Sequence, residues 1–136
     1  MPTFPGTLDS LEPIRTFVGD AATRAGLDSG AVYRLALAVD EVATNVVMHG
    51  YQENGCSGSI EIDTSIEGGM LVVRMFDTSP EYTPDDHEVL PEHLTVPLEE
   101  REPGGLGLFL TSQSVDDFRY ERLDGRNLHD FRVSLP

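Results

Sequence analysis

Residues 35–51 have the sequence Leu-Ala-Leu-Ala-Val-Asp-Glu-Val-Ala-Thr-Asn-Val-Val-Met-His-Gly-Tyr, which predicts a helix with two different faces. Four apolar residues recur at helical spacing and form one face: Leu35, Val39, Val42 and Val46. Glu41, Asn45 and His49 follow one another at intervals of four residues, so they form a polar line on a neighbouring face. Most polar helix faces are exposed to solvent, and the alternative is that this line borders a polar pocket.

The length and composition of the chain predict one soluble domain. Its 136 residues are enough to bury a core without disulfides. No apolar run approaches the roughly 20 residues of a membrane helix. The N-terminus lacks a basic segment followed by an apolar core, so no secretion signal is expected and the cytoplasm is the expected location. The single cysteine, Cys56, lies in a glycine-rich turn and is interpreted as a turn residue.

The net charge is strongly negative, with 24 acidic residues against 9 Lys and Arg and a formal charge of -15. Such a field repels phosphate backbones and anionic lipid surfaces, so nucleic acid and membranes are not expected partners. A bound nucleotide would need local compensation from a helix N-terminus, a cluster of backbone amides or a divalent cation.

The pattern of residues predicts three helices and four or five strands. An edge strand is expected within residues 3–8, interrupted by Pro5, and a first helix from Asp9 or Ser10 to about Ala25. The helix of residues 35–51 should begin near Asp28 or Ser29 and end at Gly50. Two hairpins are expected, with strands at 60–66 and 70–76 around Gly68-Gly69, and strands at 118–121 and 131–135 around Asp124-Gly125.

Residues 78–103 contain five prolines and many acids without periodicity, which predicts a long loop, and a further helix is expected to follow the glycines at 104–107. Hairpin-like strand pairs with helices between them indicate an α+β two-layer sandwich, with a mostly antiparallel sheet and helices on one face.

Three features of this chain are candidates for one shared site. They are the polar line Glu41, Asn45 and His49, the carboxylate of Asp77 at the end of an apolar strand, and the turn Gly104-Gly-Leu-Gly107 before a helix. A glycine-rich turn at a helix start lets backbone N–H groups approach a phosphate closely. Each feature alone is more often structural, and their combination is more specific than any one of them.

Together these residues resemble a known family. Glu-Val-Ala-Thr-Asn-Val-Val-Met-His-Gly-Tyr at 41–51 is similar to the N box of the anti-sigma-factor serine/threonine kinases, a branch of the histidine kinase-like ATPases with the Bergerat fold. Asp77 matches the first glycine box of that family, and Gly-Gly-Leu-Gly-Leu-Phe-Leu at 104–110 is similar to the second. The resemblance covers nearly the whole chain and implies a single ATP-binding domain at 1–136.

The resemblance also implies roles for individual residues, with ATP and Mg²⁺ as cofactors. Asn45 would bind the Mg²⁺ ion, and Glu41 would be the general base that accepts the proton of a serine or threonine hydroxyl. Asp77 would accept a hydrogen bond from the adenine amino group. Gly104, Gly105 and Gly107 would bind the phosphates through their backbone amides.

The remaining implied contacts are less direct. Residues 78–103 would form a lid over the nucleotide, and Arg101 would meet the γ-phosphate when that lid closes. His49 would lie near the phosphates or the ribose, and the alternative is that it only closes the helix C-terminus, where a cation is favourable.

The sequence departs from the family pattern after Asp77, because Ser79 stands where the family has a glycine. A side chain there is expected to crowd the adenine, and Pro80 to stiffen the turn.

The leading hypothesis is an ATP-dependent protein serine/threonine kinase that phosphorylates a small anti-sigma-factor antagonist and sequesters a sigma factor or another output protein. A homodimer is compatible with the family.

Two other functions remain open at the level of the sequence. The first is a non-catalytic binding module that keeps the scaffold and sequesters partners without phosphorylating them. The second is the ATP-binding half of a histidine kinase, which the length of the chain disfavours unless it acts in trans. The sequence does not identify the partner or the signal that triggers switching.

Overall fold

The computed structural model describes residues 1–80 and 115–136, in which two helices lie against a five-stranded sheet. The elements are β1 (Thr3–Pro5), a 3₁₀ turn at Leu8–Ser10, α1 (Leu11–Arg24), α2 (Ser29–Asn45) with a π-helical continuation at Val46–Gln52, β2 (Ser59–Glu67), β3 (Met70–Asp77), β4 (Asp117–Leu123) and β5 (Arg126–Ser134). Nearly all of the predicted lid at 78–103, the glycine turn at 104–107 and Arg101 lie outside the described residues.

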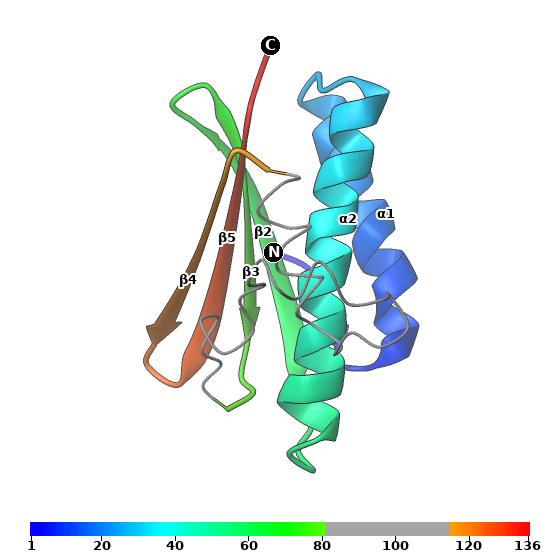
Figure 1. Cartoon of the computed structure of the whole chain (residues 1–136), viewed down its shortest axis with the longest axis vertical. Helices are drawn as coiled ribbons and strands as arrows, with labels where there is room; N and C mark the ends of the chain where they lie inside the picture. The colour runs from blue at the N-terminus through cyan, green and yellow to red at the C-terminus, as the bar shows by residue number, and fades with distance from the viewer. Residues whose placement is uncertain (81–114) are drawn as a thin grey trace, which may run out of the picture.

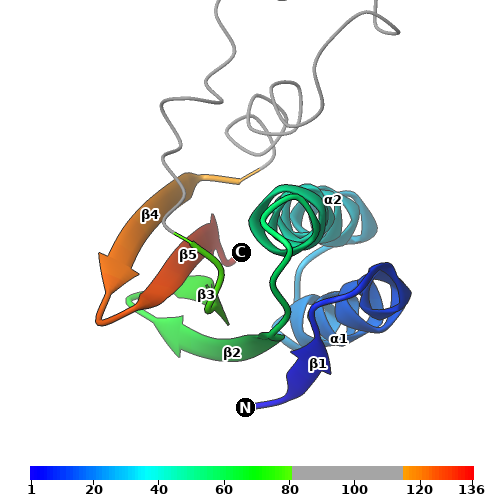
Figure 2. The same ribbon diagram turned by 90° about the horizontal axis from the view of Figure 1, so that it is seen from below.

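The sheet is antiparallel throughout, with the strand order β1-β2-β3-β5-β4. Both helices cover the same face of it, and the two views agree on this arrangement (Figures 1 and 2). The α+β fold with helices on one face is therefore confirmed. The apolar strand β3 lies at the centre of the sheet, and its residues Leu71, Val73 and Met75 belong to the core under the helices.

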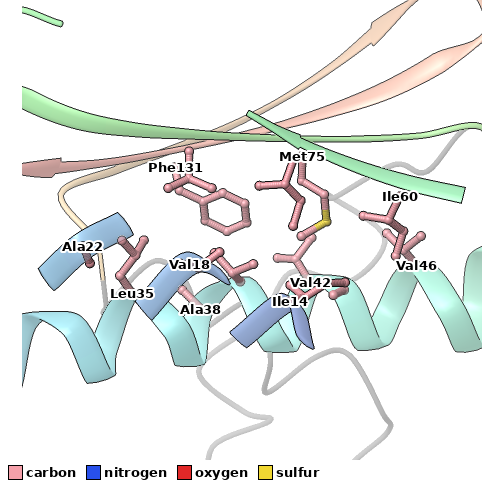
Figure 3. Close-up of a cluster of buried hydrophobic side chains, with 14 of the residues drawn as sticks. Ile14, Val18, Ala22, Leu35, Ala38, Val42, Val46, Ile60, Met75 and Phe131 are labelled. Carbon is pink, nitrogen blue, oxygen red and sulfur yellow. The ribbon is translucent and has the colours of Figure 1, made fainter. Parts of the chain in front are cut away.

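The core lies between the helices and the inner face of the sheet (Figure 3). The predicted apolar face of α2 is buried as expected, with Leu35 and Val39 fully buried and Val42 and Val46 nearly so. Ile14 and Val18 of α1 pack into the same cluster, together with Met75 and Phe131 from the two central strands. The helical spacing of apolar residues thus identified the face that holds the two layers together.

The predicted turns and one predicted cap are confirmed. Asp28 accepts a hydrogen bond from the Ala31 N–H at 2.8 Å and caps α2. Both hairpin turns have the positive φ angles that favour glycine, at Gly68-Gly69 and at Asp124-Gly125. Ser10 instead donates its hydroxyl to the Pro5 carbonyl oxygen and gives α1 no side-chain cap.

The prediction that the second helix ends at Gly50 is wrong. The chain continues to Gln52 in wide π-helical turns, and the Glu53 N–H donates to the Met48 carbonyl oxygen five residues earlier. Gly50 lies inside this π-helical segment and lacks the positive φ angle of a glycine that ends a helix. It allows a close approach instead, because a Cβ at this position would lie 2.6 Å from Ser79 Oγ.

Within residues 1–80 and 115–136, neither helix is long and apolar enough to cross a membrane.

Candidate functional site

The candidate site lies at one end of the sheet's inner face, where pairing places polar residues side by side. Asp77 at the end of β3 pairs with Asn127 at the start of β5, and Asn127 pairs with Arg122 on β4. One row further in, Met75 pairs with His129, which pairs with Tyr120. Because residues two apart on a strand share a face, Asn127 and His129 both lie beside Asp77.

Asp77 is 1% exposed, and described residues bind both of its carboxylate oxygens. Its Oδ1 accepts from Ser79 Oγ at 2.5 Å, from the Ser79 N–H at 3.0 Å and from Asn127 Nδ2 at 2.8 Å. Its Oδ2 lies 2.9 Å from His129 Nε2. Burial raises the pKa of Asp77, but the bonds from His129, Ser79 and Asn127 outweigh burial and hold the pKa below its usual value.

Asn127 connects Asp77 to the turn that follows it. Its side chain is fully buried, and its Nδ2 also lies 3.1 Å from the Ser79 carbonyl oxygen and 3.3 Å from that of Pro80. Its Oδ1 accepts hydrogen bonds from Tyr120 Oη and from Arg122 Nη1. Asn127 therefore holds the 79–80 part of this turn in place through main-chain atoms.

Tyr51 fixes the end of the π-helical segment to the same region. Its buried hydroxyl donates to the Ser59 carbonyl oxygen at 2.7 Å and accepts from the Thr78 N–H at 3.0 Å. Gly6 and Gly58 lie against its ring, since a Cβ at either position would come within 2.8 Å of it. These contacts join the end of α2 to the strands that flank Asp77.

On the helix side, Glu41 and Asn45 lie one turn apart on α2. Burial raises the pKa of the half-buried Glu41, and the neighbouring Asp40 carboxylate raises it further. Asn45 is 7% exposed, and its buried Nδ2 has no hydrogen-bond partner among the residues that the structure describes. A buried amide in this state indicates a ligand or water that completes its bonding.

His49 lies near the end of the polar line and contacts a glutamate along the helix. Its Nδ1 lies 2.8 Å from the Glu53 carboxylate, four residues later. The Asn54 side chain donates to the carbonyl oxygens of His49 and Gly50, so these helix-end carbonyls are bonded locally. His49 therefore takes part in local bonds at the helix end, and both its role in closing the helix and its contact with a nucleotide stay predictions.

A small cavity lies between the two sides of the site. Asn45 and Gly50 line it from the helix, and Asp77, Ser79 and His129 line it from the sheet. Its volume is about 10 Å³, which is room for about one water molecule. The side chain of Ser79 is 2% exposed and is packed against Gly50, so it fills the space beside Asp77.

The donor set fits an adenine nucleotide in its chemistry but not in its present volume. The Nδ2 atom of Asn45 lacks a partner among the described residues, and the oxygen of the same amide is of the kind that Mg²⁺ binds. Asp77 is a buried carboxylate at the other end of the cavity. An adenine ring, however, needs far more than 10 Å³, so the residues fit the base only if Ser79 moves.

The structure thus brings together two of the predicted site residues, Asn45 and Asp77, with Glu41 one turn away. Gly104, Gly105 and Gly107 lie outside the described residues. The sequence reasoning missed Asn127 and His129, although the alternation of β5 placed both on the same face as the apolar Phe131. A polar residue on the buried face of a strand is the signal that could have found them.

Known proteins resemble this chain over most of its length. The family model described as the histidine kinase-like ATPase domain matches residues 4–132. A serine-protein kinase RsbW from Oceanobacillus iheyensis is 31% identical over 107 residues, which cover 77% of this chain and 67% of the relative. RsbW from Bacillus subtilis strain 168 is 29% identical over 117 residues, or 82% of this chain and 71% of the relative.

Solved structures agree with the fold at low sequence identity. The RsbU and RsbW domains of Rv1364c from Mycobacterium tuberculosis match with a TM-score of 0.63 at 16% identity. The match covers 99% of this chain and 33% of that one. The SiaB-SiaC complex from Pseudomonas aeruginosa matches with a TM-score of 0.57 at 15% identity, covering 99% of this chain and 90% of that one. At such identities the likeness concerns the fold alone.

Proposed function

The chain belongs to the histidine kinase-like ATPase family, in the branch of the anti-sigma-factor serine kinases, and on this premise we propose that it is an ATP-dependent protein serine/threonine kinase. In this proposal it phosphorylates a small antagonist protein and, in exchange, binds or releases a sigma factor or another output protein. The observation that supports it best is the cavity that Asn45 lines from α2 and Asp77 from the sheet, with Glu41 one helical turn before Asn45.

Glu41 is the proposed general base. Transfer of a phosphoryl group to a hydroxyl needs a positioned acceptor for the hydroxyl proton. The raised pKa of Glu41, caused by burial and by Asp40, makes its carboxylate a better proton acceptor than an exposed glutamate. The buried side of α2 holds the helix against the core, so Glu41 is presented from a rigid element.

Asn45 and Asp77 are the proposed cofactor contacts. ATP would supply the phosphoryl group that is transferred. Asn45 would hold Mg²⁺ through its amide oxygen, and Asp77 would recognise the amino group of the base. Gly104, Gly105 and Gly107 are proposed to contact the phosphates and 78–103 to act as the lid. Residues 1–136 are proposed to form a single ATPase domain.

The proposed partner is a protein. The relatives in the comparison are named serine-protein kinases, and SiaB was solved in complex with SiaC. The charge of -15 favours a partner with a complementary basic surface, because opposite fields accelerate association.

The test replaces Glu41 with Gln, which keeps the size of the side chain and removes its basicity. Purified protein is mixed with magnesium ATP and its cognate antagonist, and phosphoserine or phosphothreonine is measured by mass spectrometry. We expect Glu41→Gln to lower kcat by about 10²- to 10⁴-fold, because proton transfer by a positioned base contributes on that order. The exposed Glu12 of α1 offers the matched control, and Glu12→Gln should retain full activity.

Two results would change the proposal. Full phosphotransfer by Glu41→Gln would remove the assignment of the base. The filled space beside Asp77 favours a second candidate, a binding module that sequesters partners without phosphorylating them. Stable binding of the antagonist by the wild-type protein with no phosphorylated product would support that second function.

A further inference from the structure

The turn after β3 places a side chain inside the candidate site. Ser79 is 2% exposed, its hydroxyl donates to Asp77 Oδ1 at 2.5 Å, and it lies against Gly50 on the opposite wall. Together with Asp77, Asn45 and His129 it leaves a cavity of about 10 Å³. The hydroxyl therefore occupies the volume next to the carboxylate that a base would approach.

Ser79 also uses the hydrogen-bonding capacity of Asp77. Each oxygen of a carboxylate offers about two lone-pair positions, and Oδ1 already accepts from Ser79 Oγ, the Ser79 N–H and Asn127 Nδ2. His129 lies at hydrogen-bond distance from Oδ2. While Ser79 keeps this position, its hydroxyl is a third donor against Oδ1, and an incoming amino group would have to take the volume that this hydroxyl fills.

We propose that Ser79 is a specificity-determining residue, which occupies the base end of the nucleotide site and must be displaced before Asp77 can recognise a base. This inference rests on the proposed nucleotide-dependent function and extends it. Ser79 lowers the affinity for adenine nucleotides, and it also lowers the preference for adenine over guanine, because it competes with the base for the group that distinguishes them.

The turn itself is anchored independently of the serine hydroxyl. Arg122 Nη1 donates to the Ser79 carbonyl oxygen at 2.9 Å, and Asn127 Nδ2 lies 3.1 Å from the same oxygen. The Ser79 N–H also donates to Asp77. All of these bonds use main-chain atoms of residue 79, so Ser79→Gly removes the obstruction and leaves the anchors in place.

The experiment measures binding of ADP and of GDP with Mg²⁺ by calorimetry. We expect Ser79→Gly to bind ADP about tenfold more tightly than the wild type, equal to about 1.4 kcal/mol. The preference for ADP over GDP should rise as well, because adenine presents an amino donor where guanine presents a carbonyl oxygen. Ser79→Ala, which keeps Cβ beside Gly50, should give a smaller gain.

Two further variants make the result specific. Ser134→Gly changes an exposed serine at the opposite end of β5 and should leave both affinities unchanged. Adding Asp77→Asn to Ser79→Gly should abolish the gained preference for ADP, since the amide lacks the second acceptor oxygen. Thermal unfolding of each variant verifies that it is folded before binding is compared.

The outcomes separate this inference from the proposed function. Equal and measurable ADP affinities for the wild type and Ser79→Gly overturn the role of Ser79 and leave the kinase proposal standing. An equal gain for ADP and GDP also overturns it. Absence of ADP binding by every variant at millimolar nucleotide overturns both proposals.

Discussion

The two faces of the central strands β3 and β5 carry hydrogen-bonded acids in very different surroundings. On the inner face, Asp77 is fully enclosed and accepts bonds from Ser79, Asn127 and His129. On the outer face, which no described helix covers, Arg74 binds Glu67 through two nitrogens at 2.9 and 3.2 Å and Asp130 at 3.2 Å. Arg132 also binds Asp130, at 2.9 Å.

The difference identifies the better candidate for ligand binding. Solvent weakens the outer ion pairs, whose arginine side chains are about a quarter exposed, so each is expected to contribute little to stability. Burial makes the inner carboxylate costly unless all of its partners remain, and it places Asp77 beside a cavity. A buried acid whose partners line a cavity is a better candidate for ligand recognition than a ladder of ion pairs whose arginines reach solvent.

The largest expected effect on stability comes from removing Asp77 on the inner face. The matched change removes Asp130 on the outer face. Asp77→Ala should lower the free energy of unfolding by about 3 kcal/mol, because Asn127 and His129 would lose their buried acceptor. Asp130→Ala on the outer face should lower it by about 1 kcal/mol, since Arg74 and Arg132 can turn to water. Urea denaturation measures both values, and equal losses would contradict the distinction between the faces.

A smaller effect is expected where α2 approaches the inner face. Gly50→Ala should lower the free energy of unfolding by about 1–3 kcal/mol, because its Cβ would lie 2.6 Å from Ser79 Oγ. Adding Ser79→Gly should recover most of that loss. Gly19→Ala on α1 is the matched control, since its Cβ would meet only Val32 at 3.9 Å, and it should stabilise the helix slightly. A loss from Gly50→Ala that Ser79→Gly leaves unchanged would locate the strain elsewhere.

The smallest effect concerns protonation on the outer face. The hydrogen bond from Arg74, aided by Ser65, lowers the pKa of Glu67 from 4.5 to about 2. The stability that this pair contributes is therefore present above about pH 4.5 and is lost as the pH falls through about 2. In Arg74→Gln the pKa of Glu67 should return toward 4.5, as measured by NMR titration of its carboxyl carbon. An unchanged titration would mean that Arg74 is not the main cause.

Local patterns in the sequence were sufficient for most of the described fold. The spacing of Leu35 and Val39 identified the buried face of α2, Asp28 identified its start, and the glycine pairs identified both hairpins. These features depend on neighbours within a few residues, so the sequence contains the information directly. The prediction for Gly50 was wrong because two kinds of glycine look the same in sequence: one that ends a helix and one that allows another segment of the protein to approach closely.

The sequence by itself determined the two helices, the strands, the hairpins and the residues of the family motifs, Glu41, Asn45 and Asp77 among them. Only the tertiary structure decided what surrounds Asp77. Asn127 and His129 are about fifty residues away along the chain, and pairing of β3 with β5 places them beside it. The same packing presses Ser79 against Gly50 and nearly closes the cavity. Periodicity reports which face a residue occupies, whereas the partner it meets there depends on strand order and register.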